Sequence, residues 1–201
     1  MDTSIRRVEA GDARAIRDIY APFVSDSATS FELAAPDLAE VERRIEAQRN
    51  RYPWLVFESG PGILGYAYAS THRDRPAYQW SVEVSVYVDP RAHRRGVGRA
   101  LYSALFDLLR RQGYVNAYAG ITLPNPSSVR LHESLGFVDV GVFRGIGFKF
   151  DRWHDVAWLH LPLVEAPRSV PEPRPAAGLW QDPDVAAMLE ACARSVRLEG
   201  D

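Results

Sequence analysis

The chain has 201 residues, with 24 basic and 26 acidic side chains and a formal net charge of −2. This near balance argues against a nucleic-acid partner, since nucleic-acid-binding domains carry a clear basic excess. A hydrophobic content of 46% is typical of a globular protein with a proper core, and no apolar run is long enough to span a bilayer. The N-terminus lacks an apolar leader and Cys192 is the single cysteine, so we expect a cytoplasmic protein with no membrane partner and no disulfide.

Hydrophobic periodicity predicts interleaved strands and helices in the first half of the chain. Short alternating runs predict strands over 5–8, 54–58, 63–70 and 78–88, the middle two joined by a Ser-Gly-Pro-Gly turn. One helix is expected to open at Asp12 as its N-cap and another at Pro36-Asp37. In strand 78–88 the valines at even positions face one way, so Glu83, Ser85 and Tyr87 face the other.

The second half continues this alternation and then changes in character. A glycine turn leads into a helix that runs to about Gln112, and a strand over 115–121, a helix over 127–135 and strands over 140–150 and 155–163 follow. Such an order indicates an α/β fold. Prolines at 167, 171, 173 and 175 predict a stiff, extended linker that is not packed, and residues 184–197 form a short amphipathic helix. We expect a main domain over 1–165 and an appendage over 166–201, whose helix could dock on the domain, dock on a second subunit or stay mobile.

The turn between residues 91 and 99 has the features of a phosphate-binding loop. A helix N-terminus offers unpaired N–H groups and a partial positive charge. Gly96 and Gly98 let a ligand approach the backbone, and Arg94, Arg95 and Arg99 add cations. On its own such a turn is more often only a tight strand-to-helix connection, and it matches neither a Walker loop nor a Rossmann fingerprint. The phosphate role therefore depends on motifs elsewhere.

Two motifs in order carry a resemblance to a known family. They are Val86-Tyr-Val-Asp-Pro-Arg-Ala-His-Arg-Arg-Gly-Val-Gly-Arg-Ala-Leu101 and Asn125-Pro-Ser-Ser-Val-Arg-Leu-His-Glu-Ser-Leu-Gly-Phe137. They resemble the acetyl-CoA motifs of the GNAT superfamily of N-acetyltransferases, the Q/R-x-x-G-x-G/A loop and the Asn-initiated helix ending in Gly-Phe. Shorter phrases, such as Ala77-Tyr-Gln-Trp and Gly147-Phe-Lys, are similar to the phosphinothricin and methionine sulfoximine N-acetyltransferases. The resemblance covers about residues 4–163, and it departs from the family at His93, where Gln or Arg is usual.

The resemblance implies a fold, a co-substrate and a set of residues that bind it. The fold is a mixed, mostly antiparallel sheet that acetyl-CoA splays in the middle, with helices on both faces, and the protein is expected to be a homodimer. The main chain of the strand would pair with the pantetheine arm and supply an N–H group for the carbonyl oxygen. Asn125 would cap its helix and reach the pantetheine. The cofactor-binding residues expected are Val86, Tyr87, Val88, Arg94, Arg95, Gly96, Val97, Gly98, Arg99 and Asn125.

Two side chains are expected to carry the chemistry of acetyl transfer. The acceptor ammonium must lose a proton before its nitrogen can attack, and the resemblance places the general base at Glu83. Without the resemblance, Glu83 reads as a solvated residue on a half-exposed strand. His132 stands where many GNAT enzymes carry a Tyr that protonates the leaving thiolate, and an imidazole can supply that proton. A helix-surface histidine with no such role is an equal alternative.

The loop over 71–78 is expected to recognise the acceptor. Arg73 and Arg75 can fork onto a carboxylate and a phosphinate or sulfone oxygen, although an Arg-rich loop is often only solvated. The resemblance adds further pocket residues and implies a small amino acid or analogue as substrate, acetylated on its α-amino group. The expected substrate-binding residues are Phe31, Arg73, Arg75, Tyr78, Thr122 and Val156.

Two alternative functions remain open. The first is a GNAT enzyme that acts on another amine or a protein N-terminus, and the second is a non-catalytic module that binds acetyl-CoA. The five histidines show no metal-ligand spacing, so no metal is expected. The adjacent residues of Trp153-His-Asp155 point apart on a strand, and we interpret them as structural.

Overall fold

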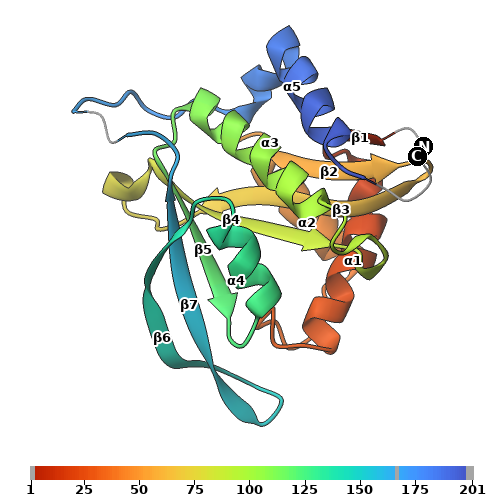
Figure 1. Cartoon of the computed structure of the whole chain (residues 1–201), viewed down its shortest axis with the longest axis vertical. Helices are drawn as coiled ribbons and strands as arrows, with labels where there is room; N and C mark the ends of the chain where they lie inside the picture. The colour runs from red at the N-terminus through yellow and green to blue at the C-terminus, as the bar shows by residue number, and fades with distance from the viewer. Residues whose placement is uncertain (1–2, 166–167, 198–201) are drawn as a thin grey trace.

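The computed structural model describes residues 3–165 and 168–197, and within these ranges the strands form one seven-stranded sheet of order β1-β2-β3-β4-β5-β7-β6 (Figure 1). Neighbouring strands are antiparallel except β4 and β5, which are parallel. This is the mixed, mostly antiparallel sheet that the sequence predicts. The strands are β1 (Thr3–Arg7), β2 (Trp54–Ser59), β3 (Gly62–Thr71), β4 (Ser81–Val88), β5 (Asn116–Thr122), β6 (Val138–Lys149) and β7 (Arg152–Pro162).

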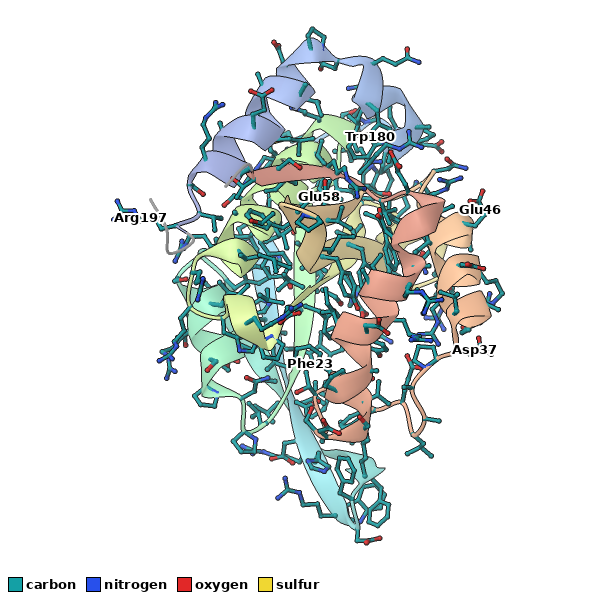
Figure 2. All side chains as sticks on the ribbon, turned by 90° about the vertical axis from the view of Figure 1, so that its right-hand side faces the viewer. Phe23, Asp37, Glu46, Glu58, Trp180 and Arg197 are labelled. Carbon is teal, nitrogen blue, oxygen red and sulfur yellow. The ribbon has the colours of Figure 1, made fainter. Side chains whose placement is uncertain are left out.

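Helices cover both faces of the sheet, as expected (Figure 2). On one face, α1 (Ala13–Ser25) and α2 (Leu38–Gln48) bury an apolar stripe against the aromatic side of β2 and β3. On the other face lies α3 (Val97–Gln112), whose buried leucines pack on the valines of β4, with α4 (Pro126–Glu133) beside it. Four 3-10 turns complete the fold: η1 (Ala10–Asp12), η2 (Pro76–Tyr78), η3 (Pro90–Ala92) and η4 (Ala176–Gln181).

The helix starts predicted at Asp12 and at Pro36-Asp37 are both confirmed, but only Asp37 caps its helix with its side chain. Asp37 accepts a hydrogen bond from the Glu40 main-chain N–H at 2.8 Å, as an N-cap should. Asp12 makes no such bond, because its carboxylate is held by Arg6 at 2.7 and 2.9 Å and by the Glu9 N–H at 2.7 Å. The ion pair with β1 thus takes the oxygens that capping would have used.

The centre of the sheet opens between β4 and β5. Within the described residues, their ladder pairs Ser81–Glu83 with Asn116–Tyr118 and goes no further, although β4 continues to Val88 and β5 to Thr122. The two strands therefore diverge beyond Glu83, and the predicted splay is confirmed.

The segment after residue 167 packs against the domain, which corrects the prediction of an unpacked linker; Pro167 lies outside the described residues. The Trp80 indole N–H donates to the Pro171 carbonyl at 2.8 Å, and the Gln112 side-chain amide donates to the carbonyls of Arg51 and Arg174 at 2.9 and 2.6 Å. Helix α5 (Pro183–Arg194) then lies over β1 and α3, at the top of Figure 1. It buries Val185, Leu189 and Ala193 there, so the apolar stripe of this helix packs on the core of the same chain.

Candidate active site

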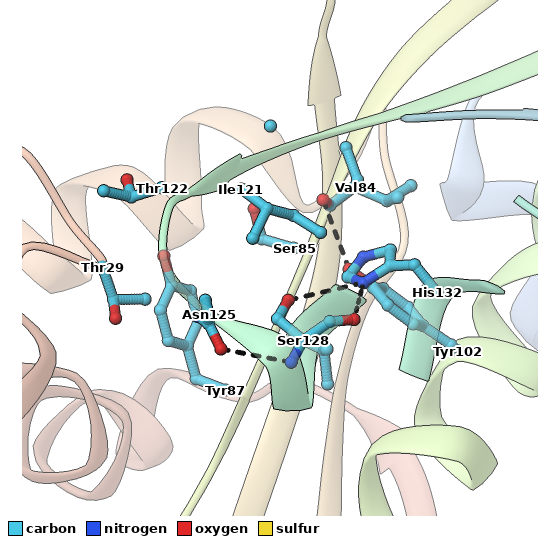
Figure 3. A pocket seen from close by; sticks show the side chains of 13 residues that line it. Thr29, Val84, Ser85, Tyr87, Tyr102, Ile121, Thr122, Asn125, Ser128 and His132 are labelled. Atoms are coloured by element: carbon cyan, nitrogen blue, oxygen red, sulfur yellow. Dashed lines mark hydrogen bonds between the residues drawn. The ribbon is translucent and has the colours of Figure 1, made fainter. Parts of the chain in front are cut away.

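The divergence of β4 and β5 leaves a narrow gap through the sheet, with a cavity of about 60 Å³ (Figure 3). Main-chain groups of β4 line one side of the gap. The Asp89 N–H donates to the Leu64 carbonyl on β3, so by alternation Tyr87 also turns its main chain toward β3. The even-numbered residues Val84, Val86 and Val88 therefore turn theirs toward the gap. Of the three main-chain partners expected for a pantetheine arm, Val86 and Val88 face the gap and Tyr87 does not.

The tyrosine at position 87 has a different task. Its ring packs on the face of the sheet that α1 and α2 cover, 5.3 Å from the ring of Tyr66 and 5.0 Å from that of Tyr20. Burial raises the pKa of its hydroxyl well above the ordinary value. Tyr87 therefore anchors β4 to the α1 face while the main chain of its neighbours borders the gap.

The glycine loop ends at the N-terminus of α3, as the phosphate hypothesis requires. Gly96 has φ +92° at the N-cap, a conformation that favours glycine. A Cβ at Gly98 would lie 3.4 Å from Leu131 and 3.5 Å from Val88, which is ordinary van der Waals contact, so α4 and β4 lie close to this position. Val97 is buried and fixes the first turn, which leaves the loop's N–H groups pointing out of the helix end.

The basic residues of the loop differ in their surroundings. Arg94 is exposed and has φ +62°, and Arg95 is half-buried. Arg99 reaches the end of α4, where it donates to the Ser134 hydroxyl at 2.6 Å and to the Ser134 carbonyl at 3.3 Å. His93 places Nε2 3.0 Å from the Val88 carbonyl. The unusual histidine thus ties the loop to the end of β4.

The far side of the gap holds a hydrogen-bonded chain of side chains (Figure 3). Asn125 accepts from the Ser128 N–H at 3.1 Å, the cap that the sequence predicts. His132 is buried, so the surface-histidine alternative is wrong. Its Nδ1 lies 2.8 Å from the Ser128 carbonyl, and its Nε2 lies 3.1 Å from the hydroxyl of Tyr102, which sits 3.4 Å from the Val84 carbonyl.

This arrangement fixes how His132 can handle a proton. A carbonyl only accepts, so Nδ1 carries the hydrogen, and burial lowers the pKa of the ring. In the neutral ring Nε2 accepts from the Tyr102 hydroxyl, whose own pKa burial raises. Tyr102 was not predicted from the sequence, where it reads as one more apolar position on the buried face of α3.

Glu83 lies in a wider pocket that adjoins the gap. This pocket has a volume of about 380 Å³ and shares Thr29, Val84, Ser85, Gly120 and Thr122 with the gap. The Glu83 side chain is 36% exposed, and its Oε1 is 3.1 Å from His72 Nδ1. Burial raises the pKa of Glu83, while the hydrogen bond from His72 and the charge of Arg73 oppose the rise. A carboxylate therefore stands where the gap opens into the pocket.

The structure brings together four of the six residues expected to bind the acceptor. Phe31, Arg73, Thr122 and Val156 line the pocket with Glu83. Arg75 and Tyr78 are not among its lining residues; Tyr78 is 43% exposed and sets its ring edge-on to His72, 6.3 Å away. Lining residues that the sequence did not indicate as part of the pocket are Thr29, Val84, Ser85, Gly120, Phe143, Ile146 and Trp158.

The segment that carries Thr29 and Phe31 is held by the only lysine of the chain. Lys149 is buried at the end of β6, and its Nζ donates to the carbonyls of Val24 at 2.6 Å, Ser27 at 3.1 Å and Ser30 at 2.7 Å. Gly147, two residues before, leaves room for the Phe31 ring, which a Cβ there would overlap. The phrase Gly147-Phe-Lys thus builds one wall of the pocket.

Within residues 3–165 and 168–197, no group of three or more His, Cys, Asp or Glu side chains is placed to hold a metal ion. Over the same ranges, every helix is too short or too polar to cross a bilayer.

Comparison with known proteins agrees with this geometry. A family model described as an acetyltransferase (GNAT) domain matches residues 5–158. A phosphinothricin N-acetyltransferase of Streptomyces coelicolor is 42% identical over 166 residues, which cover 76% of this chain and 91% of that protein. An L-methionine sulfoximine/L-methionine sulfone acetyltransferase of Salmonella typhimurium is 37% identical, covering 81% and 95%.

A solved structure shows the same fold. The phosphinothricin acetyltransferase of Sinorhizobium meliloti, in complex with acetyl-CoA, gives a TM-score of 0.78 at 35% identity, covering 85% of this chain and 96% of that one. The chain belongs to the GNAT family of acetyltransferases.

Proposed function

We propose that the enzyme transfers the acetyl group of acetyl-CoA to the α-amino group of a small amino acid or analogue of the phosphinothricin or methionine sulfoximine type. The observation that carries this proposal is the junction of the two cavities. The gap, bordered by the main chain of β4, opens directly beside Glu83 into a pocket of about 380 Å³ that contains Arg73. A pocket of this size suits a compact acceptor, and a guanidinium suits its carboxylate.

Acetyl-CoA would be bound by main-chain groups more than by side chains. The N–H groups of residues 94–99 at the α3 terminus would bind its pyrophosphate, with Arg94, Arg95 and Arg99 as the adjacent cations. The main chain of Val86 and Val88, with the Asn125 side chain across the gap, would hold the pantetheine arm. When bound, acetyl-CoA supplies an activated thioester carbonyl carbon to the acceptor nitrogen.

Glu83 would act as the general base. Its carboxylate accepts a proton from the acceptor ammonium, directly or through a water molecule, and so frees the nitrogen lone pair. A β4 main-chain N–H that faces the gap would stabilise the developing charge on the carbonyl oxygen. The new C–N bond replaces the C–S bond, and the pair of electrons leaves with the CoA sulfur.

His132 and Tyr102 would act together on the leaving thiolate. Since Nε2 of the neutral His132 ring accepts from the Tyr102 hydroxyl, this O–H would turn from Nε2 to the sulfur and give it the proton, with His132 holding Tyr102 in place beforehand. A Tyr102→Phe enzyme that kept full single-turnover rate would exclude Tyr102 from this step.

A thiol-release assay against a panel of acceptors tests the substrate proposal. We expect turnover with phosphinothricin, methionine sulfoximine and methionine sulfone, and none with a peptide N-terminus, because a pocket of about 380 Å³ suits a single compact amino acid. Arg73→Gln should raise KM for these acceptors about tenfold with KM for acetyl-CoA unchanged, since it removes a charge-assisted carboxylate contact. Turnover confined to peptides or polyamines would support the rival GNAT activity, and no thiol release with any acceptor would support a non-catalytic binding module.

We propose further that the enzyme works as a cytoplasmic homodimer in detoxification or resistance. The β6–β7 hairpin extends from the body in Figure 1 and exposes a row of apolar side chains, among them Ile146 at 55%, Phe148 at 53% and Trp153 at 67%. Monomers seldom expose so much apolar surface in one place. Light scattering should give twice the mass of the chain, and Trp153→Glu should shift it toward the monomer.

The two parts of the chain would have different roles at this site. We propose that residues 1–165 form the acetyltransferase unit and that 166–201 form a supporting appendage. In its described part, Val196 lies beside the glycine loop, with its Cα 4.0 Å from where a Gly96 Cβ would stand. A chain ending at residue 165 should therefore bind acetyl-CoA more weakly by calorimetry, and equal affinity would reject the supporting role.

A further inference from the structure

His72 lies directly after β3, beside the general base proposed on β4. Its Nδ1 is 3.1 Å from Glu83 Oε1. The ring is fixed by its neighbours, because it stacks on Tyr118 with 4.5 Å between centroids and meets Trp158 edge-on at 5.9 Å. Its side chain is 13% exposed, against 36% for Glu83. The proposed reaction assigns no task to this histidine.

The contact determines the protonation of the ring. An ionised carboxylate can only accept hydrogen bonds, so His72 Nδ1 must carry a hydrogen when Glu83 is charged. In the neutral ring the lone pair is then on Nε2. Because the hydrogen bond uses Oε1, it leaves Oε2 as the oxygen that can receive a proton from the acceptor.

Several other groups surround the pair. Arg73 from the loop after β3 is the charged neighbour, and its charge, like the hydrogen bond from His72, opposes the effect of burial on the pKa of Glu83. Tyr118 faces the pair from β5 and Tyr78 faces it from η2. His160 of β7 stacks on Tyr118 at 4.8 Å, and its Nε2 lies 2.8 Å from Asn116 Oδ1.

We propose that His72 is the positioning residue for Glu83: the Nδ1–H donates to Oε1, orients the carboxylate toward the acceptor and keeps it ionised in a half-buried pocket. This inference rests on the proposed function, in which Glu83 is the base. A structural role alone would lower activity equally at all pH values, whereas a positioning role changes the pH at which activity is lost.

Three variants separate these roles in pH profiles of kcat/KM for the acceptor. His72→Phe keeps a ring on Tyr118 but removes the hydrogen-bond donor to Glu83. The acidic limb of the profile should therefore move up by about one pH unit. At a pH below the limb, this variant should have about tenfold less activity than the wild type. His72→Asn replaces Nδ1–H by an amide N–H and should restore the wild-type limb. His160→Phe, the control on the other side of Tyr118, should leave the limb in place. The acceptor ammonium titrates alike in all four enzymes, so differences between them report Glu83.

A second measurement is made on the unaltered enzyme and needs a variant only to assign the His72 signals. Nitrogen-15 histidine spectra at neutral pH, with the His72 signals identified from their loss in His72→Phe, should show hydrogen on Nδ1. An Nε2–H tautomer would overturn the inference, and so would an unshifted limb in His72→Phe or a His72→Asn enzyme that behaves like the phenylalanine variant. If Glu83→Gln keeps its turnover, the proposed base fails as well; if Glu83→Gln is inactive and the limb does not move, the inference about His72 alone fails.

Discussion

Glu83→Gln should lower kcat by 10²- to 10⁴-fold, the range that general-base catalysis contributes, while the Kd for acetyl-CoA stays within about twofold. The amide keeps the volume of the side chain but cannot accept the acceptor's proton. The carrier site lies farther along β4 and in the glycine loop, so it should not be disturbed. Stopped-flow thiol release gives kcat, and calorimetry gives the affinity.

Ser85→Ala is a suitable control for this experiment, because it alters another pocket-lining side chain on the same face of β4 without touching the carboxylate. The wild-type profile should lose activity as the pH falls through the pKa of Glu83, which burial raises above that of an ordinary glutamate. Full turnover in Glu83→Gln would show that another group takes the proton. So would a pH profile of its residual rate that keeps the acidic limb of the wild type.

Lys149→Met should lower the melting temperature by roughly 10 °C and raise KM for the acceptor more than tenfold. The substitution leaves the Val24 and Ser30 carbonyls buried without their ammonium donor, and each unsatisfied acceptor costs about 1–3 kcal/mol. For a chain of this size, 1 kcal/mol corresponds to about 2–4 °C. The segment that carries Phe31 would lose its anchor and with it one wall of the pocket.

Arg152→Met is the matched control, since Arg152 pairs with Lys149 across the hairpin but is exposed. It should leave both the melting temperature and KM almost unchanged. Calorimetric unfolding and steady-state kinetics at fixed acetyl-CoA provide the two readouts. A Lys149→Met enzyme with wild-type KM for the acceptor would show that the anchor serves stability alone.

Local patterns were sufficient to predict the elements of the fold. Strand and helix periods depend on neighbouring residues, so the predicted limits of β2 and α3 agree closely with the observed ones. Asp12 stands at the predicted N-cap position, but its side chain does not cap the helix because Arg6, on another element, holds the carboxylate. The linker was misjudged for a similar reason: its prolines do specify extended backbone, but Trp80 and Gln112 supply donors for its carbonyls.

Part of the candidate site could likewise be predicted from local motifs, and part depends on contacts between distant residues. Glu83, the glycine loop and Asn125 lie in motifs that can be recognised along the chain, and the strand period correctly placed the side chain of Tyr87. The main-chain direction of Tyr87 could not be predicted, since it depends on which residues of β3 and β4 form the hydrogen-bonded pairs. His72, Tyr102 and Lys149 act on partners 11, 30 and as many as 125 residues away.

Residues close together along the chain specify the α/β order of elements, the glycine turn at a helix N-terminus and the strand before it that carries Glu83. These depend on side-chain period and backbone freedom, which neighbouring residues largely set. Three features arise only when the chain folds: β4 and β5 diverge after Glu83, His72 holds this carboxylate, and Lys149 fixes the pocket wall. Hydrogen bonds and burial join residues that only folding brings together, so these contacts are not encoded in any single segment of the chain.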